Sequence, residues 1–204
     1  MNVTDAQEER ASALTHGFGL LLGLFAVPAL LIDQYEADSR LWWGLAIFGL
    51  SLLMVYATST LYHSVVNPRI KYILQVADHI SIYFLIAGTH TPLLLHYLPG
   101  SIYLGLIWML VAVGVFYKLF FFNRWEWLSV ALYLGMGWMG VLTLPYMLDL
   151  MPSTTLNGII IGGVSYTLGV VFYAWRRLPY HHAIWHLFVI GGTAAHFWAI
   201  WEML

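Results

Sequence analysis

Long apolar runs alternate with short polar segments along the whole chain. Seven runs are present, each close to the roughly 20 residues that a helix needs to cross a bilayer. They cover residues 11–32, 41–63, 78–97, 102–122, 127–148, 156–175 and 182–203. In lipid the backbone polar groups of an isolated segment are bonded internally only in a helix. The pattern therefore predicts an all-α membrane protein, a bundle of seven transmembrane helices forming one integral membrane domain over residues 1–204.

The amino-acid composition excludes several classes of protein. Of the 204 residues, 61% are apolar and 9% are charged, against about 25% charged residues in a soluble domain. Seven spans of about 21 residues occupy roughly 147 positions, which leaves no room for a second domain. The net charge of -2 and the lack of a basic run argue against nucleic-acid binding. With no cysteine in the chain, its nine histidines are the main candidates for chemistry.

The first apolar run is expected to stay in the protein as a helix. The segment before it carries Asp5, Glu8 and Glu9 rather than the basic stretch of a secretory signal peptide. Small residues recur four apart as Gly19-x-x-x-Gly23 and Gly158-x-x-x-Gly162, which predicts close packing within the bundle. Pro145 lies inside the fifth run and predicts a kink. We see no internal repeat and no broken span, which disfavours a proton- or ion-coupled transporter.

The distribution of basic residues predicts the orientation of the chain. Only Arg40 falls on the side of the membrane opposite the N-terminus. The other seven Lys and Arg residues fall on the N-terminal side, and they are Arg10, Arg69, Lys71, Lys118, Arg124, Arg176 and Arg177. Because cytoplasmic loops are enriched in Lys and Arg, we expect a cytoplasmic N-terminus and an external C-terminus.

Several ionisable side chains fall at one predicted depth, near the cytoplasmic ends of the spans. They are His16 in the first span, His63 at the end of the second, Asp78 at the start of the third, and His182 and His186 at the start of the last. Glu9, Thr15 and Ser59 fall in the same layer. An ionisable group in lipid costs several kcal/mol without a partner. Since the orientation rests on Lys and Arg alone, this convergence is independent support for a shared site.

The spacing of these histidines suits a metal. His182 and His186 are four residues apart, so on a helix they share a face, about 6 Å apart along the axis. His63 would supply a third ligand, with Ser59 one turn deeper on the same helix. Three neutral histidines with an open fourth position are typical of a catalytic zinc. Asp78 would then be a ligand, a group that orients the zinc-bound water, or a general base.

Other interpretations of the histidines remain open. A histidine at a helix end is commonly an interfacial residue with a wet edge, which is our expectation for His79, His96 and His181. His90 and His196 lie about 15–18 Å deeper than the candidate site, at 1.5 Å per residue. We expect them to be buried hydrogen-bond partners, with a bis-histidine haem site as the alternative. The last span lacks the glutamate of the HExxH zinc-protease helix, and one histidine cluster is too few for a membrane desaturase.

Four motifs, in order along practically the whole chain, resemble the hemolysin III family. They are ERASALTH at residues 9–16, Ser59-x-x-x-His63-Ser64, Asp78-His79 with IYFLIAGTHTP at residues 82–92, and His182-x-x-x-His186 followed by LFVIGGTAAHF. This family comprises bacterial relatives of the progestin and adipoQ receptors, including the adiponectin receptors, and more distantly resembles alkaline ceramidases. The chain departs from the family pattern at His90, where a tyrosine is expected.

The resemblance implies a seven-helix bundle with a zinc near the cytoplasmic leaflet. The three histidines that hold zinc in the receptor relatives match His63, His182 and His186. Ser59 and Asp78 match the accompanying serine and aspartate, the latter associated with the water on the metal. The relatives are linked to hydrolysis of lipid amides such as ceramide, and the bacterial branch to haemolysis or membrane homeostasis.

We therefore expect a multi-pass protein of the bacterial inner membrane with a membrane lipid as substrate or ligand. The leading hypothesis is a zinc-dependent hydrolase of a lipid amide or ester that enters laterally from the bilayer. Asp78 would accept a proton, and Ser59 would bind the substrate or the water. The alternative is a non-enzymatic sensor of membrane homeostasis, or a membrane-permeabilising haemolytic protein, with structural zinc. A pore would need polar residues at successive depths, whereas here they gather mainly at one.

Overall fold

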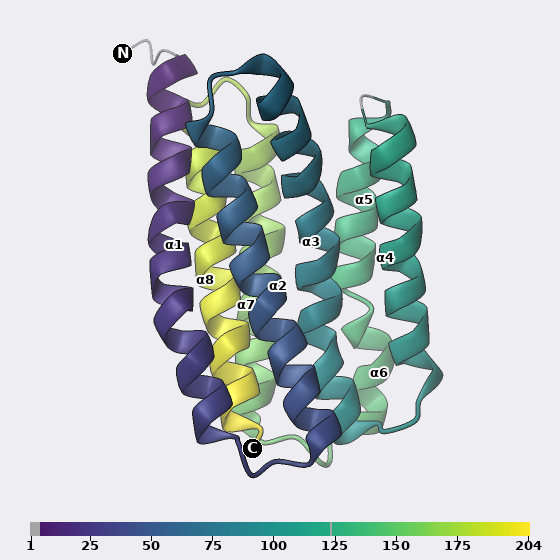
Figure 1. Cartoon of the computed structure of the whole chain (residues 1–204). Helices are drawn as coiled ribbons and strands as arrows, with labels where there is room; N and C mark the ends of the chain where they lie inside the picture. Colours follow the sequence, from purple (N-terminus) through teal and green to yellow (C-terminus); the bar gives the residue numbers. More distant parts are fainter. Residues whose placement is uncertain (1–4, 123) are drawn as a thin grey trace.

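The structure, a computed structural model, describes residues 5–122 and 124–204 as helices joined by short connections (Figure 1). The helices are α1 (Asp5–Asp33), α2 (Ser39–Ser64), α3 (Pro68–Tyr97), α4 (Ile102–Phe121), α5 (Glu126–Gly137), α6 (Gly140–Met147), α7 (Ser153–Ala174) and α8 (His181–Glu202). Helices α5 and α6 together make one apolar segment, so the described chain has seven segments able to cross a membrane by length and composition. The predicted all-α bundle is confirmed, while its orientation in the membrane stays a prediction.

The helices close into a ring. Helix α1 packs between α2 and α8, α2 packs against α3, and α3 packs against both α4 and α5. Helix α5 reaches α7, and α7 packs against α8, which completes the ring. In Figure 1, α4, α5 and α6 stand to one side of the other helices, and the two termini lie at opposite ends of the bundle. The first residues of α1 and the last residues of α2 therefore share one end with the start of α8.

Apolar side chains cover the outside of the bundle as well as filling its core, unlike in a soluble protein. Large apolar side chains such as Phe25, Leu14 and Ile73 are mostly exposed on the outside of the bundle. Polar side chains including Asp78 and Lys118 are instead buried among the helices. Lipid tails favour an apolar outer surface, and polar groups at membrane depth need partners inside the bundle. The chain is a multi-pass integral membrane protein.

The repeated glycines let neighbouring helices approach closely, as predicted. A Cβ atom added to Gly158 would lie 2.8 Å from the Cβ atom of Ala199 on α8, and one added to Gly162 would overlap the ring of His196. The corresponding glycines of α1, Gly19 and Gly23, face side chains of α2 in the same way. These small residues hold the ring of helices together by van der Waals packing.

Helix α3 begins ten residues before the predicted span. Asn67 caps it, because the side-chain oxygen Oδ1 accepts hydrogen bonds from the backbone N–H of Arg69 at 3.1 Å and of Ile70 at 3.3 Å. Pro68 follows in the first turn, where its missing N–H costs nothing. Asp78 therefore lies about three turns inside α3 rather than at its start. The cap and not the apolar run sets where this helix begins.

The fifth span is broken, which contradicts the expectation of uninterrupted spans. Helix α5 ends at Gly137 and α6 begins at Gly140, whereas Pro145 lies inside α6. Glycine weakens a helix because it gains much backbone freedom on unfolding. Trp138, at the break, donates a hydrogen bond from its indole N–H to the hydroxyl of Thr167 on α7 at 3.1 Å. This contact ties the break to α7, the neighbouring helix in the ring.

Candidate metal centre and adjoining cavity

Three histidines from two helices meet at the N-terminal end of the bundle. His63 comes from the last turn of α2, and His182 and His186 come from the first turns of α8. One ring nitrogen of each lies within 4.8 Å of the others. A tetrahedral zinc with bonds of about 2.0 Å holds its nitrogen ligands about 3.3 Å apart. The cluster could therefore hold a metal ion after small side-chain adjustments, as the sequence predicts.

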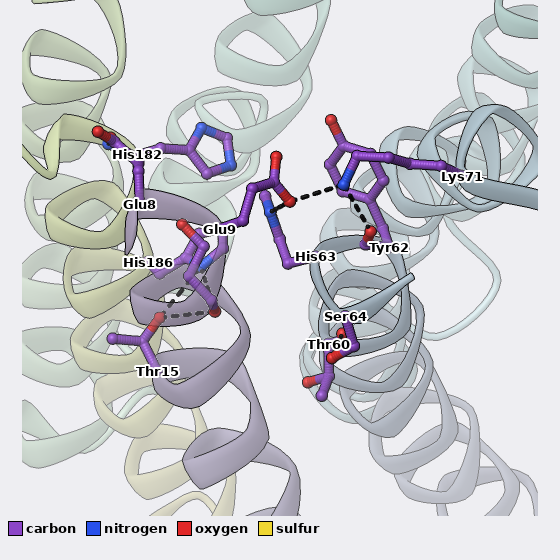
Figure 2. A network of polar contacts seen from close by, with 11 residues as sticks. Glu8, Glu9, Thr15, Thr60, Tyr62, His63, Ser64, Lys71, His182 and His186 are labelled. Carbon is purple, nitrogen blue, oxygen red and sulfur yellow. Dashed lines mark hydrogen bonds and ion pairs between the residues drawn. The ribbon is translucent and has the colours of Figure 1, made fainter. Parts of the chain in front are cut away.

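Hydrogen bonds orient two of these rings and determine which of their nitrogens is free to bind a metal. Nδ1 of His63 lies 3.1 Å from a carboxylate oxygen of Glu9, and Nδ1 of His186 lies 3.1 Å from the backbone oxygen of Ser12 (Figure 2). Since a carboxylate and a carbonyl oxygen only accept, Nδ1 carries the proton in both rings. Nε2 of His63 is buried and has no hydrogen-bond partner among the described residues. In metal-binding histidines the ring nitrogen that does not bind the metal usually donates to a carboxylate or a backbone oxygen, as Nδ1 does in both rings here.

Glu9 connects the cluster to α3. The oxygen of Glu9 that meets His63 also accepts from the Lys71 ammonium at 2.7 Å (Figure 2). Lys71 donates in addition to the backbone oxygen of Tyr62 at 3.1 Å and lies over the Tyr62 ring. The carboxylate is thus fixed from two sides, and it fixes the plane of the His63 ring.

Glu8 holds the start of α8. Tyr180, the residue before this helix, has a left-handed backbone (φ 60) and gives no side-chain cap. The carboxylate of Glu8 accepts from the backbone N–H of Tyr180 at 3.2 Å and of His182 at 3.1 Å. Nε2 of His181 lies 3.7 Å away from the same group. An anion at a helix N-terminus satisfies free N–H groups and the helix dipole, so Glu8 positions the turn that carries His182.

His16 packs directly behind the cluster. Its ring is 3% exposed as a residue and stacks on the ring of His186, with centroids 3.5 Å apart and planes 10° apart. The edge of Tyr56 closes its other side at 5.2 Å. Neither ring nitrogen of His16 has a hydrogen-bond partner within the described ranges. His16 is not one of the three clustered ligands, although it lies in the same layer, as predicted.

A cavity of about 140 Å³ adjoins the cluster. Its head is lined by the predicted site residues Ser59, Asp78, His182 and His186, together with His16. Deeper in the bundle its walls are mainly apolar, from side chains such as Val55, Ile82, Leu85 and Val189. One water needs roughly 10–15 Å³ of such space, so the cavity has room for several waters or part of an acyl chain. The structure thus brings Ser59 and Asp78 beside the histidines.

Three other histidines, His79, His90 and His196, form hydrogen bonds between their rings and backbone oxygens. His90 and His196, which line the deep part of the cavity, bond to the backbone oxygens of Ile86 at 2.9 Å and of Ile159 at 3.2 Å. These are the hydrogen-bond roles expected for them. His79, expected at the membrane interface, lines the cavity, and its Nδ1 bonds to a backbone oxygen one turn earlier.

Sequence reasoning missed Lys118. It was placed with the basic residues of the membrane surface, but it is only 2% exposed and lines the same cavity. The only local signal is its position in the last turn of an apolar helix, which is equally typical of a surface lysine.

Comparison with known proteins agrees with the geometry. The family pattern described as Haemolysin-III related matches residues 4–197. The chain is 40% identical over 200 residues to "Hemolysin-3 homolog" of Bacillus subtilis (strain 168), covering 95% of this chain and 93% of that protein. It is 36% identical over 204 residues to "Hemolysin-3" of Bacillus cereus, covering 95% and 90%. It is 29% identical over 208 residues to "Monocyte to macrophage differentiation factor" of Homo sapiens, covering 97% and 84%. The chain belongs to the haemolysin-III related family.

Proposed function

We propose that this chain is a zinc-dependent hydrolase of a lipid amide or ester bond. The observation that carries the proposal is the placement of a buried three-histidine cluster at the head of an apolar cavity that also contains Asp78 and Ser59. Three nitrogen donors with a free fourth position suit a catalytic rather than a closed structural zinc. A carboxylate and a hydroxyl beside them supply the groups that hydrolysis needs.

Zinc at this site would activate a water molecule and polarise the carbonyl group of the substrate. Asp78 would accept a proton from the attacking water and return it to the leaving nitrogen or oxygen. Ser59 donates a hydrogen bond from its hydroxyl to the substrate or to the water. The products are a fatty acid and an amine or an alcohol, so one water is consumed for each bond broken.

The surroundings of the site support a lipid as the substrate. The deeper walls of the cavity are mainly apolar, which suits an acyl chain. The outer surface of the bundle is also apolar, so a lipid substrate can approach the protein while its tail stays in the bilayer. The substrate then keeps its tail in an apolar environment while its polar linkage reaches the histidines.

The test compares the lipids of cells that express the native chain, Asp78→Asn, or no copy. Asp78→Asn keeps the size of the side chain and all three histidines but removes the proton acceptor. We expect one class of lipid amide or ester to fall, and its fatty acid to rise, only with the native chain. The purified protein should hydrolyse that same lipid. Identical lipid profiles for the native chain and Asp78→Asn would refute the hydrolase.

A non-enzymatic membrane role is the second candidate, and the name of the Bacillus cereus relative favours it. The cavity also carries polar groups at two depths, near His186 and near His196. If the purified protein releases dye from liposomes, and Asp78→Asn releases it equally well, the protein permeabilises membranes and the histidine cluster has a structural role. A hydrolase would instead leave the dye inside.

A further inference from the structure

Lys118 occupies an unusual position for a membrane lysine. It lies in the last turn of α4, where a lysine ordinarily extends along the helix to place its ammonium in water. Here the residue is 2% exposed, whereas the side chain of Lys71 at the same end of the bundle is 29% exposed. The stem of Lys118 therefore turns inward, toward the cavity that its side chain lines.

The ammonium of Lys118 forms no ion pair in the described part of the chain, and the charge of Glu126 acts on it only from beyond 4.0 Å. No carboxylate oxygen there lies within 4.0 Å of it, and it donates no hydrogen bond to a described residue. Its neighbours are aromatic rings, with centroids at 4.9 Å for Phe122, 5.9 Å for Tyr117 and 6.0 Å for Tyr133. Cation–π contacts offset only part of the free energy that burying an ammonium costs.

Ser129 and Tyr133, two hydroxyl-bearing side chains, line the same cavity as Lys118. The hydroxyl of Ser129 is buried and has no hydrogen-bond partner among residues 5–122 and 124–204, and Ser129 lines the cavity together with Lys118. The hydroxyl of Tyr133 donates to the backbone oxygen of His79 at 2.9 Å, which fixes its ring beside the ammonium. A positive charge and an unpartnered hydroxyl that line one cavity are groups that an anionic oxygen can bind.

Two carboxylates also line this cavity. Glu126 is engaged elsewhere, since one of its oxygens accepts from the Tyr173 hydroxyl at 2.8 Å and the other from the Arg176 guanidinium. Asp78 lies at the head of the cavity and forms no ion pair with Lys118. Both Asp78 and Lys118 line the cavity without pairing, so a ligand in the cavity could pair with the ammonium.

We propose that Lys118 and Ser129 bind the anionic group of a lipid inside this cavity, either a carboxylate or a phosphate. The ammonium would pair with the anionic oxygens, and the serine hydroxyl would donate a further hydrogen bond. The apolar cavity walls would take an acyl chain. Binding at this site needs no metal, so it does not depend on the proposed hydrolysis. A fatty acid carries the carboxylate and a phospholipid carries the phosphate, and the experiment separates these two sources.

The experiment measures displacement of a fluorescent fatty acid from the full chain in non-ionic detergent after metal removal with a chelator. The competitors are oleic acid and its uncharged methyl ester in one arm, and phosphatidic acid and uncharged diacylglycerol in the other. We expect at least one anionic lipid to compete about tenfold or more better than its neutral analogue, because hydrogen bonds to a charged group are stronger than those to a neutral one. The arm with this preference identifies the carboxylate or the phosphate as the ligand.

Lys118→Met keeps the length and apolar stem of the side chain but removes the charge, and it should abolish this preference. Lys118→Arg keeps the charge and should retain it. Thermal unfolding in detergent shows whether both variants fold. The proposal is overturned if charged and neutral lipids compete equally with the native chain, a result that does not depend on any variant. It is also overturned if folded Lys118→Met discriminates as well as the native chain does.

Discussion

Replacing Glu9 tests whether α1 positions the metal ligands from outside the cluster. One oxygen of this carboxylate accepts from Nδ1 of His63 at 3.1 Å and from the ammonium of Lys71 at 2.7 Å. Glu9→Gln keeps the shape and one acceptor oxygen but loses the charge that pairs with Lys71. Glu9→Ala removes both contacts, so the His63 ring loses the partner that directs Nε2 toward the other histidines.

The expected effect follows from these lost contacts. Mutation of a residue that orients a metal-binding histidine typically lowers metal affinity by about 10–100-fold, or about 1.4–2.7 kcal/mol. We expect a loss of metal affinity of about tenfold for Glu9→Gln, because its amide oxygen can still accept from the ring, and of about 100-fold for Glu9→Ala. The three ligands themselves stay in place in both variants, so binding should weaken without being abolished.

The assay is a competition titration of zinc between the purified protein and a chromophoric chelator. Glu36→Gln is the matched control, since Glu36 is exposed between α1 and α2 at the other end of the bundle and its side chain accepts from the Tyr35 hydroxyl at 3.1 Å. Its zinc affinity should equal that of the native chain. Native affinity in Glu9→Ala, or an equal loss in Glu36→Gln, would refute the role assigned to Glu9.

Three further predictions test other parts of the structure. Gly158→Ala should lower the unfolding temperature, because the added methyl group overlaps α8 and such overpacking costs about 1–3 kcal/mol. Gly105→Ala is the control: no atom crowds this helix position, so the change should be neutral or stabilise the protein by up to about 1 kcal/mol. Glu8→Gln should destabilise the start of α8 by about 0.5–2 kcal/mol, measured as faster amide hydrogen exchange there; unchanged exchange would exclude its capping role. Because the chain has no cysteine, a single introduced cysteine reports on which side of the membrane its loop lies. A membrane-impermeant maleimide should label Ala37→Cys in intact cells, and Val66→Cys only after permeabilisation. The reverse labelling pattern would show that the predicted topology is inverted.

Some features of this protein follow from local sequence patterns. Run length predicts the spans, because a helix rises a fixed distance per residue and the bilayer has a set thickness. The spacing of His182 and His186 places them on one helix face, and the alternating direction of the spans brings the end of α2, with His63, to the same end of the bundle. Fixed helix geometry therefore makes the ligand cluster predictable.

Other features depend on contacts between distant segments. The two partners of Glu9 lie on α2 and α3, and no local pattern pairs them with α1. The burial of Lys118 depends on how three aromatic rings lie around its ammonium, one from α4, one from α5 and one from the connection between these helices. Two wrong predictions, the late start of the third span and the unbroken fifth span, do have local signals in the sequence. Asn67 followed by Pro68 is typical of a helix start, and the glycines around Trp138 weaken the fifth span.

Metal content of the purified protein tests the central claim most directly. The native chain and Asp78→Asn should each carry about one zinc per chain, because all three histidine ligands are present in both. His186→Ala should lose most of its zinc, since two remaining nitrogens make a much weaker site. Native protein purified without any bound metal, or His186→Ala with a full complement, would contradict the account.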